Sequence, residues 1–456
     1  MRQPAGIDAL GVPADDRGAA RALWRLGAPI ATQAIVSSLL GFLDTLMVSA
    51  LGAAALGGVG LGGRLLFVLT MMLVGISSGV GVLVAQFAGA GRRRAIRGPV
   101  TAAALLGIVI TLPFAALCAL APHMLADWMT PDMDVAQHAA RFLQWGALYA
   151  PLTAVALVLG ATVRSLGDAR TPLVAGLVAL LINALLNFLF ISGRFGLPAY
   201  GVAAAAVATT LARLVEIGWL LVELRPGALR PSRRRDARLV LGIALPLMAK
   251  EIFWAGGLFA TALIVSRMGT VPLAAFNLVA PIEGVLMSVF VGCGAACGIL
   301  LGHALGRRAF DEAYAAALRL LRLVPRWAFV TGLVVAVLAQ AAKALPIPGD
   351  RLPDEVLTLA LDTLTVFCLT IAARTHNTMV SIGILRSGND VAWLMAVDFA
   401  SMWLVNIPLV AIAALVLQWP LPAVVGVAML EEVFKVALFR WRVRGGKWLK
   451  AISPAG

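Results

Sequence analysis

The sequence predicts an all-α polytopic membrane protein with twelve transmembrane helices in two six-helix repeats. Three observations favour this fold class. The 456 residues are 61% hydrophobic and 13% charged, with a mean hydropathy of +0.93, which is too apolar for a soluble multidomain protein. Apolar runs follow one another along the chain, separated by glycine, proline and charged residues. The second half of the chain also repeats spaced features of the first.

Twelve apolar runs are long enough to be membrane spans. They cover residues 25–50, 58–90, 98–121, 138–162, 172–192, 200–223, 240–266, 273–305, 326–345, 356–383, 392–417 and 421–440. Most Lys and Arg residues fall after the even-numbered spans and in the tail, whereas the opposite loops hold few. Because basic loops stay in the cytoplasm, we expect both termini there. The same clustering explains the net charge of +14, so nucleic acid is not an expected partner.

The two halves share a fixed spacing. Pro29, Gly52, Leu56, Gly75, Gly81 and Gly89 recur at one constant offset as Pro246, Gly269, Leu273, Gly292, Gly298 and Gly306, and the GVA at 201 recurs at 426. Six spans is an even number, so both repeats enter the membrane in the same direction. The expected divisions are a cytoplasmic segment 1–24, a lobe 25–224, a basic linker 225–239, a lobe 240–440 and a basic tail 441–456.

Asp44 is the main functional candidate. It is the single ionisable residue between Ala28 and Leu51. A charged side chain at the centre of a membrane helix costs roughly 2.5 to 3.5 kcal/mol, so we expect Asp44 to face a protein interior or a water-filled cavity. The alternative is a structural Asp44 that is hydrogen-bonded or snorkels to the membrane surface.

Further polar groups lie in the later spans of the first half. Asn183 and Asn187 are four positions apart and share a helix face, and Thr209 lies in the following span. Amide oxygens can bind a cation or pair with a carboxyl group, but asparagine also joins membrane helices by hydrogen bonds. Both roles stay open for the pair.

The second half has a different polar set. Thr261 stands at the position equivalent to Asp44, and a new acid appears at Glu251. The other intramembrane residues are Glu283, Arg374, His376, Asn377 and Asp398. We expect Arg374 to pair with Glu251 or Asp398, as a structural clamp or as part of transport.

Two further interpretations concern the same half. Glu431, Glu432 and Lys435 have the spacing of ion pairs on one helix. His376 fits helix packing or, alternatively, proton handling.

No enzyme signature is present in the sequence. It has no GxxxxGK[ST] phosphate loop and no metal-binding spacing of Cys and His, so we expect no catalytic residues, no metal and no cofactor. The four cysteines all lie in apolar segments. Any uphill transport would then draw on an ion gradient.

Several stretches resemble the multidrug and toxic compound extrusion (MATE) family. PIATQAIVSSLLGFLDTLMVSALG is similar to the family's first helix, and VRSLGDARTPL followed by Asn183 to its fourth and fifth. LPLMAKEIFWAGG with SRMGTVPLAAFN resembles the seventh, and ARTHNTMVSIGILRSGND with VDFASMWLVNIPL the tenth and eleventh. The likeness covers roughly residues 20 to 450 and includes the basic ending RWRVRGGKWLK.

The resemblance implies a V-shaped, two-lobe transporter of the bacterial inner membrane. Such a protein exports amphipathic, often cationic compounds in exchange for protons or sodium, and we expect a monomer in the lipid bilayer. By the resemblance, Asp44, Asn183 and Thr209 belong to the cation site of the first lobe. Glu251 corresponds to an acid of sodium-coupled members. A flippase for a lipid-linked intermediate is the alternative within the same superfamily.

The chain departs from the family pattern at two positions. Asn187 falls where some members carry an aspartate, and the tenth-helix aspartate of sodium-coupled members is replaced near Thr375. Because the second-lobe sodium set is incomplete, protons are favoured over sodium as the coupling ion. The expected cavity residues are Asp44, Asn183, Asn187, Thr209 and Glu251, with Arg374, His376, Asn377 and Asp398 as the polar set of the second lobe.

Overall fold

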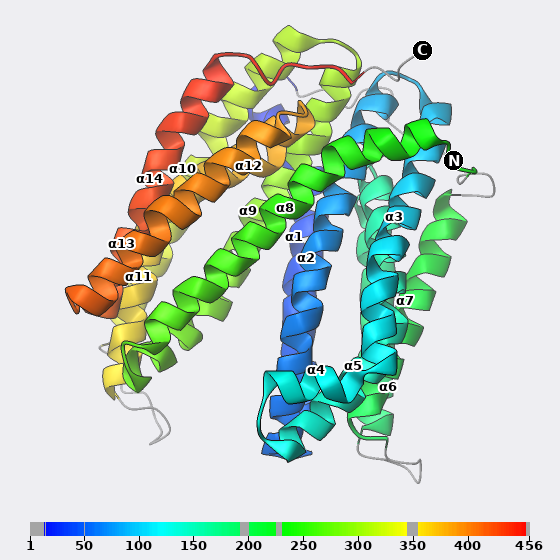
Figure 1. Ribbon diagram of the computed structural model, residues 1–456. Helices are drawn as coiled ribbons and strands as arrows, with labels where there is room; N and C mark the ends of the chain where they lie inside the picture. The colour runs from blue at the N-terminus through cyan, green and yellow to red at the C-terminus, as the bar shows by residue number, and fades with distance from the viewer. Residues whose placement is uncertain are drawn as a thin grey trace. The chain divides into compact units, whose positions relative to one another are not determined.

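The computed structural model describes residues 13, 15–49, 51–191, 200–224, 230–343 and 354–452, without the side chains of residues 40–46, 49 and 53. All regular secondary structure in these ranges is helical, which confirms the predicted all-α class (Figure 1). The first repeat comprises α1 (Asp16–Ser49), α2 (Ala53–Gly89), α3 (Arg93–Leu120), α4 (Pro122–Met129), α5 (Met133–Ser165), α6 (Arg170–Phe190) and α7 (Val202–Leu224). The second begins with α8 (Arg234–Ser266), α9 (Thr270–Gly306), α10 (Phe310–Ala342) and α11 (Asp354–Thr378), and continues through η3 (Met379–Leu385), α12 (Val391–Phe399), η4 (Ala400–Asn406), α13 (Ile407–Ala411), η5 (Ile412–Val416) and α14 (Leu421–Arg444).

Ten helices among the described residues are long and apolar enough to cross a membrane. They match ten of the twelve expected spans. The other two expected spans fall on α1, part of whose side chains is outside the described residues, and on α14, which carries several charged residues. The chain is therefore a multi-pass membrane protein.

The repeat seen in the sequence is also a repeat of helices. Helices α2 and α9 each have 37 residues and begin at positions that the constant sequence offset relates to each other. The same offset relates the first residues of α3 and α10. Gly52 and Gly269 cap α2 and α9 with φ values of 108° and 114°. Only glycine adopts these angles without strain, so the turns that precede α2 and α9 require glycine at these positions.

The described chain divides into two compact units. One holds Thr32–Glu251, and the other holds the chain from Ile252 onward together with the part of α1 up to Ala31. The division therefore falls inside α1 and α8 and not at a loop. The first helix of each repeat begins in the unit formed mainly by the other repeat.

Two glycines related by the repeat make room for these helix segments. In the first unit, a Cβ on Gly75 of α2 would lie 2.6 Å from the backbone nitrogen of Met248 in α8. In the second unit, a Cβ on Gly292 of α9 would lie 2.6 Å from the Gly27 carbonyl oxygen of α1 and 2.9 Å from the Ala31 nitrogen. Backbones approach this closely only where one residue lacks a side chain.

The second repeat also contains π-helical turns. The segments η3, η4 and η5 interrupt the expected spans 356–383 and 392–417. In a π turn the backbone hydrogen bonds span five residues and not four, and such turns often lie at functional sites. The interruptions lie on the helices that carry His376, Asn377 and Asp398.

Candidate functional site

Three of the residues predicted for the first-lobe site, Asn183, Asn187 and Thr209, are joined by hydrogen bonds. The Asn187 amide nitrogen donates to Asn183 Oδ1 at 3.3 Å, and the Asn183 amide nitrogen donates to Thr209 Oγ1 at 3.1 Å. The Thr209 hydroxyl in turn donates to the Ala205 carbonyl at 2.8 Å. Both asparagines are buried, with 5% and 1% of their surface exposed. Helices α6 and α7 are therefore joined by a polar strip inside otherwise apolar helices.

Asp44 lies in α1, but its side chain is outside the described residues. Its relation to the Asn183–Thr209 strip stays a prediction. Another polar residue of α1, Gln33, forms side-chain hydrogen bonds within the first unit. Gln33 donates to the Pro172 carbonyl at 3.2 Å, and Arg164 Nη1 donates to Gln33 Oε1 at 3.4 Å.

Glu251 lies beside Lys250, with Nζ and Oε1 3.5 Å apart. Both side chains are buried in the part of α8 that belongs to the first unit. The next residue, Ile252, already belongs to the second unit. The ion pair therefore marks the place where α8 passes from one unit to the other.

Arg374 forms its ion pair with Glu283 of α9. The expected pairing of Arg374 with Glu251 or Asp398 is therefore wrong. Helix α9 packs against α11, which brings Glu283 to the guanidinium. The guanidinium also lies over the Phe367 ring, 4.9 Å from its centroid, a favourable cation–π arrangement.

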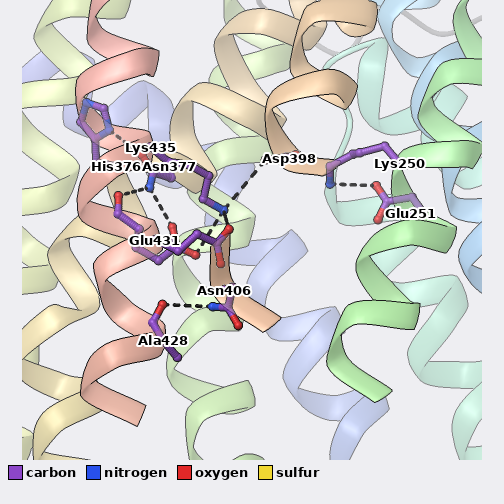
Figure 2. A network of polar contacts seen from close by, with 10 residues as sticks. Lys250, Glu251, His376, Asn377, Asp398, Asn406, Ala428, Glu431 and Lys435 are labelled. Atoms are coloured by element: carbon purple, nitrogen blue, oxygen red, sulfur yellow. Dashed lines mark hydrogen bonds and ion pairs between the residues drawn. The ribbon is translucent and has the colours of Figure 1, made fainter. Parts of the chain in front are cut away.

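A charged network in the second unit collects the remaining predicted residues (Figure 2). Lys435 Nζ lies 2.9 Å from Glu431 Oε1 and 3.5 Å from Glu432 Oε1, which confirms the pairing along α14. The same ammonium lies 4.0 Å from Asp398 Oδ1 of α12. The network therefore joins α14 to α12.

Two further residues connect α11 to this network. The Asn377 amide donates to Glu432 Oε2 at 2.7 Å and to the Glu432 carbonyl at 2.8 Å. His376 Nδ1 lies 3.2 Å from Asn377 Oδ1, and both residues are buried. Three of the four predicted polar residues of the second lobe thus belong to one network, and Arg374 makes its ion pair with Glu283.

Asn406 also belongs to this region but was absent from the predicted set. Its amide donates to the Ala428 carbonyl at 3.1 Å, joining η4 to α14. A buried asparagine within an apolar span is the sequence signal that indicates it.

The described residues contain no group of three or more His, Cys, Asp or Glu side chains arranged to hold a metal ion. The polar groups are instead amides, a hydroxyl and ion-paired side chains inside apolar helices. Such groups are costly in a membrane and mark pathways for ions or substrates. Two repeated sets of membrane helices with buried polar groups define the class of a polytopic membrane transporter.

The comparisons with known proteins identify the family within this class. The MatE family model matches residues 29–189 and 246–412, and the chain belongs to that family. The multidrug resistance protein MdtK of Edwardsiella ictaluri is 26% identical over 405 residues, covering 85% of this chain and 86% of the relative. The multidrug resistance protein NorM of Vibrio vulnificus is 25% identical over 406 residues, with the same coverage.

The fold is also that of solved transporters. A MOP superfamily transporter from Pyrococcus furiosus has a TM-score of 0.84 at 18% identity, covering 98% of this chain and 100% of that one. A MATE family transporter in an outward-facing conformation has a TM-score of 0.83 at 17% identity, with the same coverage. The two-lobe MATE fold predicted from the sequence is confirmed.

Proposed function

We propose that this protein exports amphipathic, often cationic organic compounds from bacteria in exchange for an inward-moving cation, by alternating access of its two lobes. It acts as a monomer in the inner membrane, with both termini in the cytoplasm. The family membership and the multidrug resistance relatives support this class of substrate. The flippase alternative is not favoured, because these relatives are multidrug resistance proteins.

The observation that carries the proposal is the buried strip from Asn187 through Asn183 to Thr209. Polar groups inside membrane helices are rare, and where they gather in one place they often mark the path of an ion or a substrate. We assign Asp44 as the ionisable partner of this strip and Glu251 as a further residue of the substrate cavity. Asp44 supplies one negative charge, so one monovalent cation neutralises the site, and a cationic substrate competes with that cation.

The proposed coupling ion is the proton. A sodium site needs several oxygen ligands and a permanently ionised carboxylate, whereas a proton site needs one carboxyl that can be protonated in the working range. The Asn183 and Asn187 amides and the Thr209 hydroxyl already bond to one another or to the backbone. This arrangement suits hydrogen bonding to a carboxyl group better than a full shell of sodium ligands.

The test is dye efflux from proteoliposomes that contain the purified protein. An imposed pH gradient without sodium should drive export, and Asp44→Asn should abolish it while the protein stays folded. Export that requires a sodium gradient and ignores the pH gradient would overturn proton coupling. Equal efflux by Asp44→Asn and the parent would overturn the assignment of Asp44.

A further inference from the structure

The first turns of α1 lie on α10 within the second unit. Arg319 Nη1 donates to the Pro13 carbonyl at 2.7 Å, and Arg319 Nε lies 3.5 Å from Asp16 Oδ1. Eight residues further along each helix, the Trp24 and Trp327 rings stack with their centroids 5.8 Å apart and an angle of 25° between their planes. The two contacts show that the start of α1 runs beside α10 in the same direction.

Arginines lie on both helices around this tryptophan pair. Arg25 directly follows Trp24, and Arg326 directly precedes Trp327. The arginines of each helix are three or four residues apart, a spacing that places each set on one helix face. The full set is Arg17, Arg21 and Arg25 on α1 and Arg319, Arg322 and Arg326 on α10. All of them except Arg319 are exposed, and together they form a surface that we call the basic face.

Few of these charges are neutralised within the protein. Asp16 is paired with Arg319. In the described ranges of the chain, the other arginines of the basic face have no carboxylate within ion-pair distance, and Arg322 Nε donates to the Leu318 carbonyl of its own helix at 3.4 Å. The basic face therefore carries an excess of positive charge that an anion from outside the chain can neutralise.

The tryptophans indicate the depth of the basic face in the membrane. The spans expected from the sequence begin at 25 and 326, so Trp24 and Trp327 lie where the apolar interior meets the polar surface. Tryptophan is enriched at this level because its ring is apolar and its N–H group is polar. Arginine side chains near helix ends extend toward the same level. The basic face thus lies at the height of the lipid headgroups.

The corresponding surface of the first repeat lacks these features. The constant offset between the repeats places Leu241 at the position of Trp24 and Ile110 at that of Trp327. Arginines at the start of α3 and α8 are enough to orient the spans of that repeat. Orientation alone therefore does not explain the tryptophan pair or the arginines of α10. The residues of α3 that stand in place of these arginines are Ala102, Leu105 and Val109.

We propose that the basic face binds the phosphate headgroup of an anionic phospholipid. Guanidinium groups bind phosphate oxygens with two parallel hydrogen bonds, and clusters of arginine next to a membrane helix attract anionic lipids. A phosphate held from both helices fixes the start of α1 on α10. The inference rests on the proposed function only for the leaflet, which is the cytoplasmic one because both termini are assigned there. Lipid binding itself is measured without transport.

The experiment measures lipid binding to the purified full-length protein in detergent by native mass spectrometry. The probes are dioleoylphosphatidylglycerol, which is anionic, and dioleoylphosphatidylcholine, which has no net charge. The parent should bind phosphatidylglycerol several-fold more tightly than phosphatidylcholine. Arg25→Gln with Arg326→Gln should weaken phosphatidylglycerol binding by roughly tenfold and leave phosphatidylcholine binding unchanged. Arg25→Lys with Arg326→Lys keeps both charges and should retain most of the preference for phosphatidylglycerol.

The first repeat provides a matched control. Arg234→Gln with Arg238→Gln removes two exposed arginines from the start of α8, at the positions equivalent to Arg17 and Arg21. This variant has the same net charge as Arg25→Gln with Arg326→Gln and should bind phosphatidylglycerol like the parent. If Arg25→Gln with Arg326→Gln is not monodisperse, each substitution alone should show part of the loss.

Three outcomes would overturn the proposal. Equal binding of the two lipids by the parent would mean that the basic face does not select an anionic headgroup. Equal losses in the two double variants would assign the effect to net charge and not to the basic face. Displacement of phosphatidylglycerol by inorganic phosphate at the same concentration would indicate a site for a free anion. None of these outcomes bears on efflux through the Asp44 site, which the proteoliposome assay tests separately.

Discussion

Gly75 of α2 lies directly against Met248 of α8, so close that a Cβ on the glycine would be 2.6 Å from the methionine backbone nitrogen. The contact joins the second helix of one repeat to the first helix of the other, within one compact unit. Gly292, the equivalent glycine of the second repeat, makes the corresponding contact with Gly27 and Ala31 in the other unit. Each unit thus depends on a helix segment from the other repeat.

Gly75→Val and Gly292→Val should each destabilise the protein. The nearest atom to each Cβ position belongs to the backbone and cannot rotate away, so the helices must separate, at a cost of about 1–3 kcal/mol or more. The measurement is the melting temperature in detergent with the yield of monodisperse protein. Gly284→Val is the control, because nothing lies within 4 Å of its Cβ position. Equal effects of all three changes would show that packing at the two glycines is not tight.

Neutralising Arg374 or Glu283 alone should cost more stability than neutralising both. Each single change leaves an unpaired charge of which less than a third is exposed, at a cost on the order of 2–4 kcal/mol, whereas the double variant removes both charges. The check is a double-mutant cycle of Arg374→Gln and Glu283→Gln read by thermal unfolding. Losses that simply add would mean that the two side chains do not act as a pair.

The pair of Arg442 and Asp390 should stabilise the end of the second unit. Arg442 Nε and Nη2 donate to the Asp390 carboxylate at 2.6 and 2.8 Å, and the guanidinium lies 5.0 Å from the Trp393 ring centroid. These hydrogen bonds raise the pKa of Arg442, which lies beyond the expected span 421–440. Arg442 therefore stays ionised at neutral pH.

Arg442→Ala should lower the free energy of unfolding by about 2 kcal/mol, because it leaves the buried Asp390 carboxylate without its two donors. Arg444→Ala removes a neighbouring arginine as the matched control and should have little effect. Limited proteolysis and thermal unfolding would report the difference. The idea fails if the two variants unfold alike.

Thr209→Val should reduce ion-coupled efflux while leaving the protein folded. Valine keeps the shape of the side chain but removes the oxygen that accepts the Asn183 amide, so the polar strip loses its end. Thr210→Val is the neighbouring control, because that hydroxyl donates to a carbonyl one turn earlier in its own helix. We expect at least a several-fold loss of dye efflux rate for Thr209→Val only. Similar rates for both variants would exclude a role for the hydroxyl.

Periodicity and spacing alone predicted the helices and their repetition. A constant offset read from a few glycines and prolines reappears as equal lengths and equivalent starts for α2 and α9. Local rules also predicted the contacts within one helix. Lys435 pairs with Glu431 and Glu432 because residues three and four positions apart lie on one helix face.

These local rules could not predict which charged residues pair between different helices. Arg374 is 91 residues from Glu283, and the sequence holds several acids at comparable depth, so only the packing of α9 against α11 selects one of them. The approach of Asp398 to Lys435 likewise depends on where α12 and α14 meet.

The sequence by itself determined that this chain is a membrane protein of two repeats, because hydropathy and repeat spacing are properties of the linear chain, and its resemblance to the MATE family pointed to a transporter. The tertiary structure decided which buried charges neutralise one another and that α1 and α8 each divide between the two units. The physical reason is that a helical pattern specifies which side chains share a face but not which neighbouring helix that face contacts. That choice depends on close approach at positions such as Gly75 and Gly292.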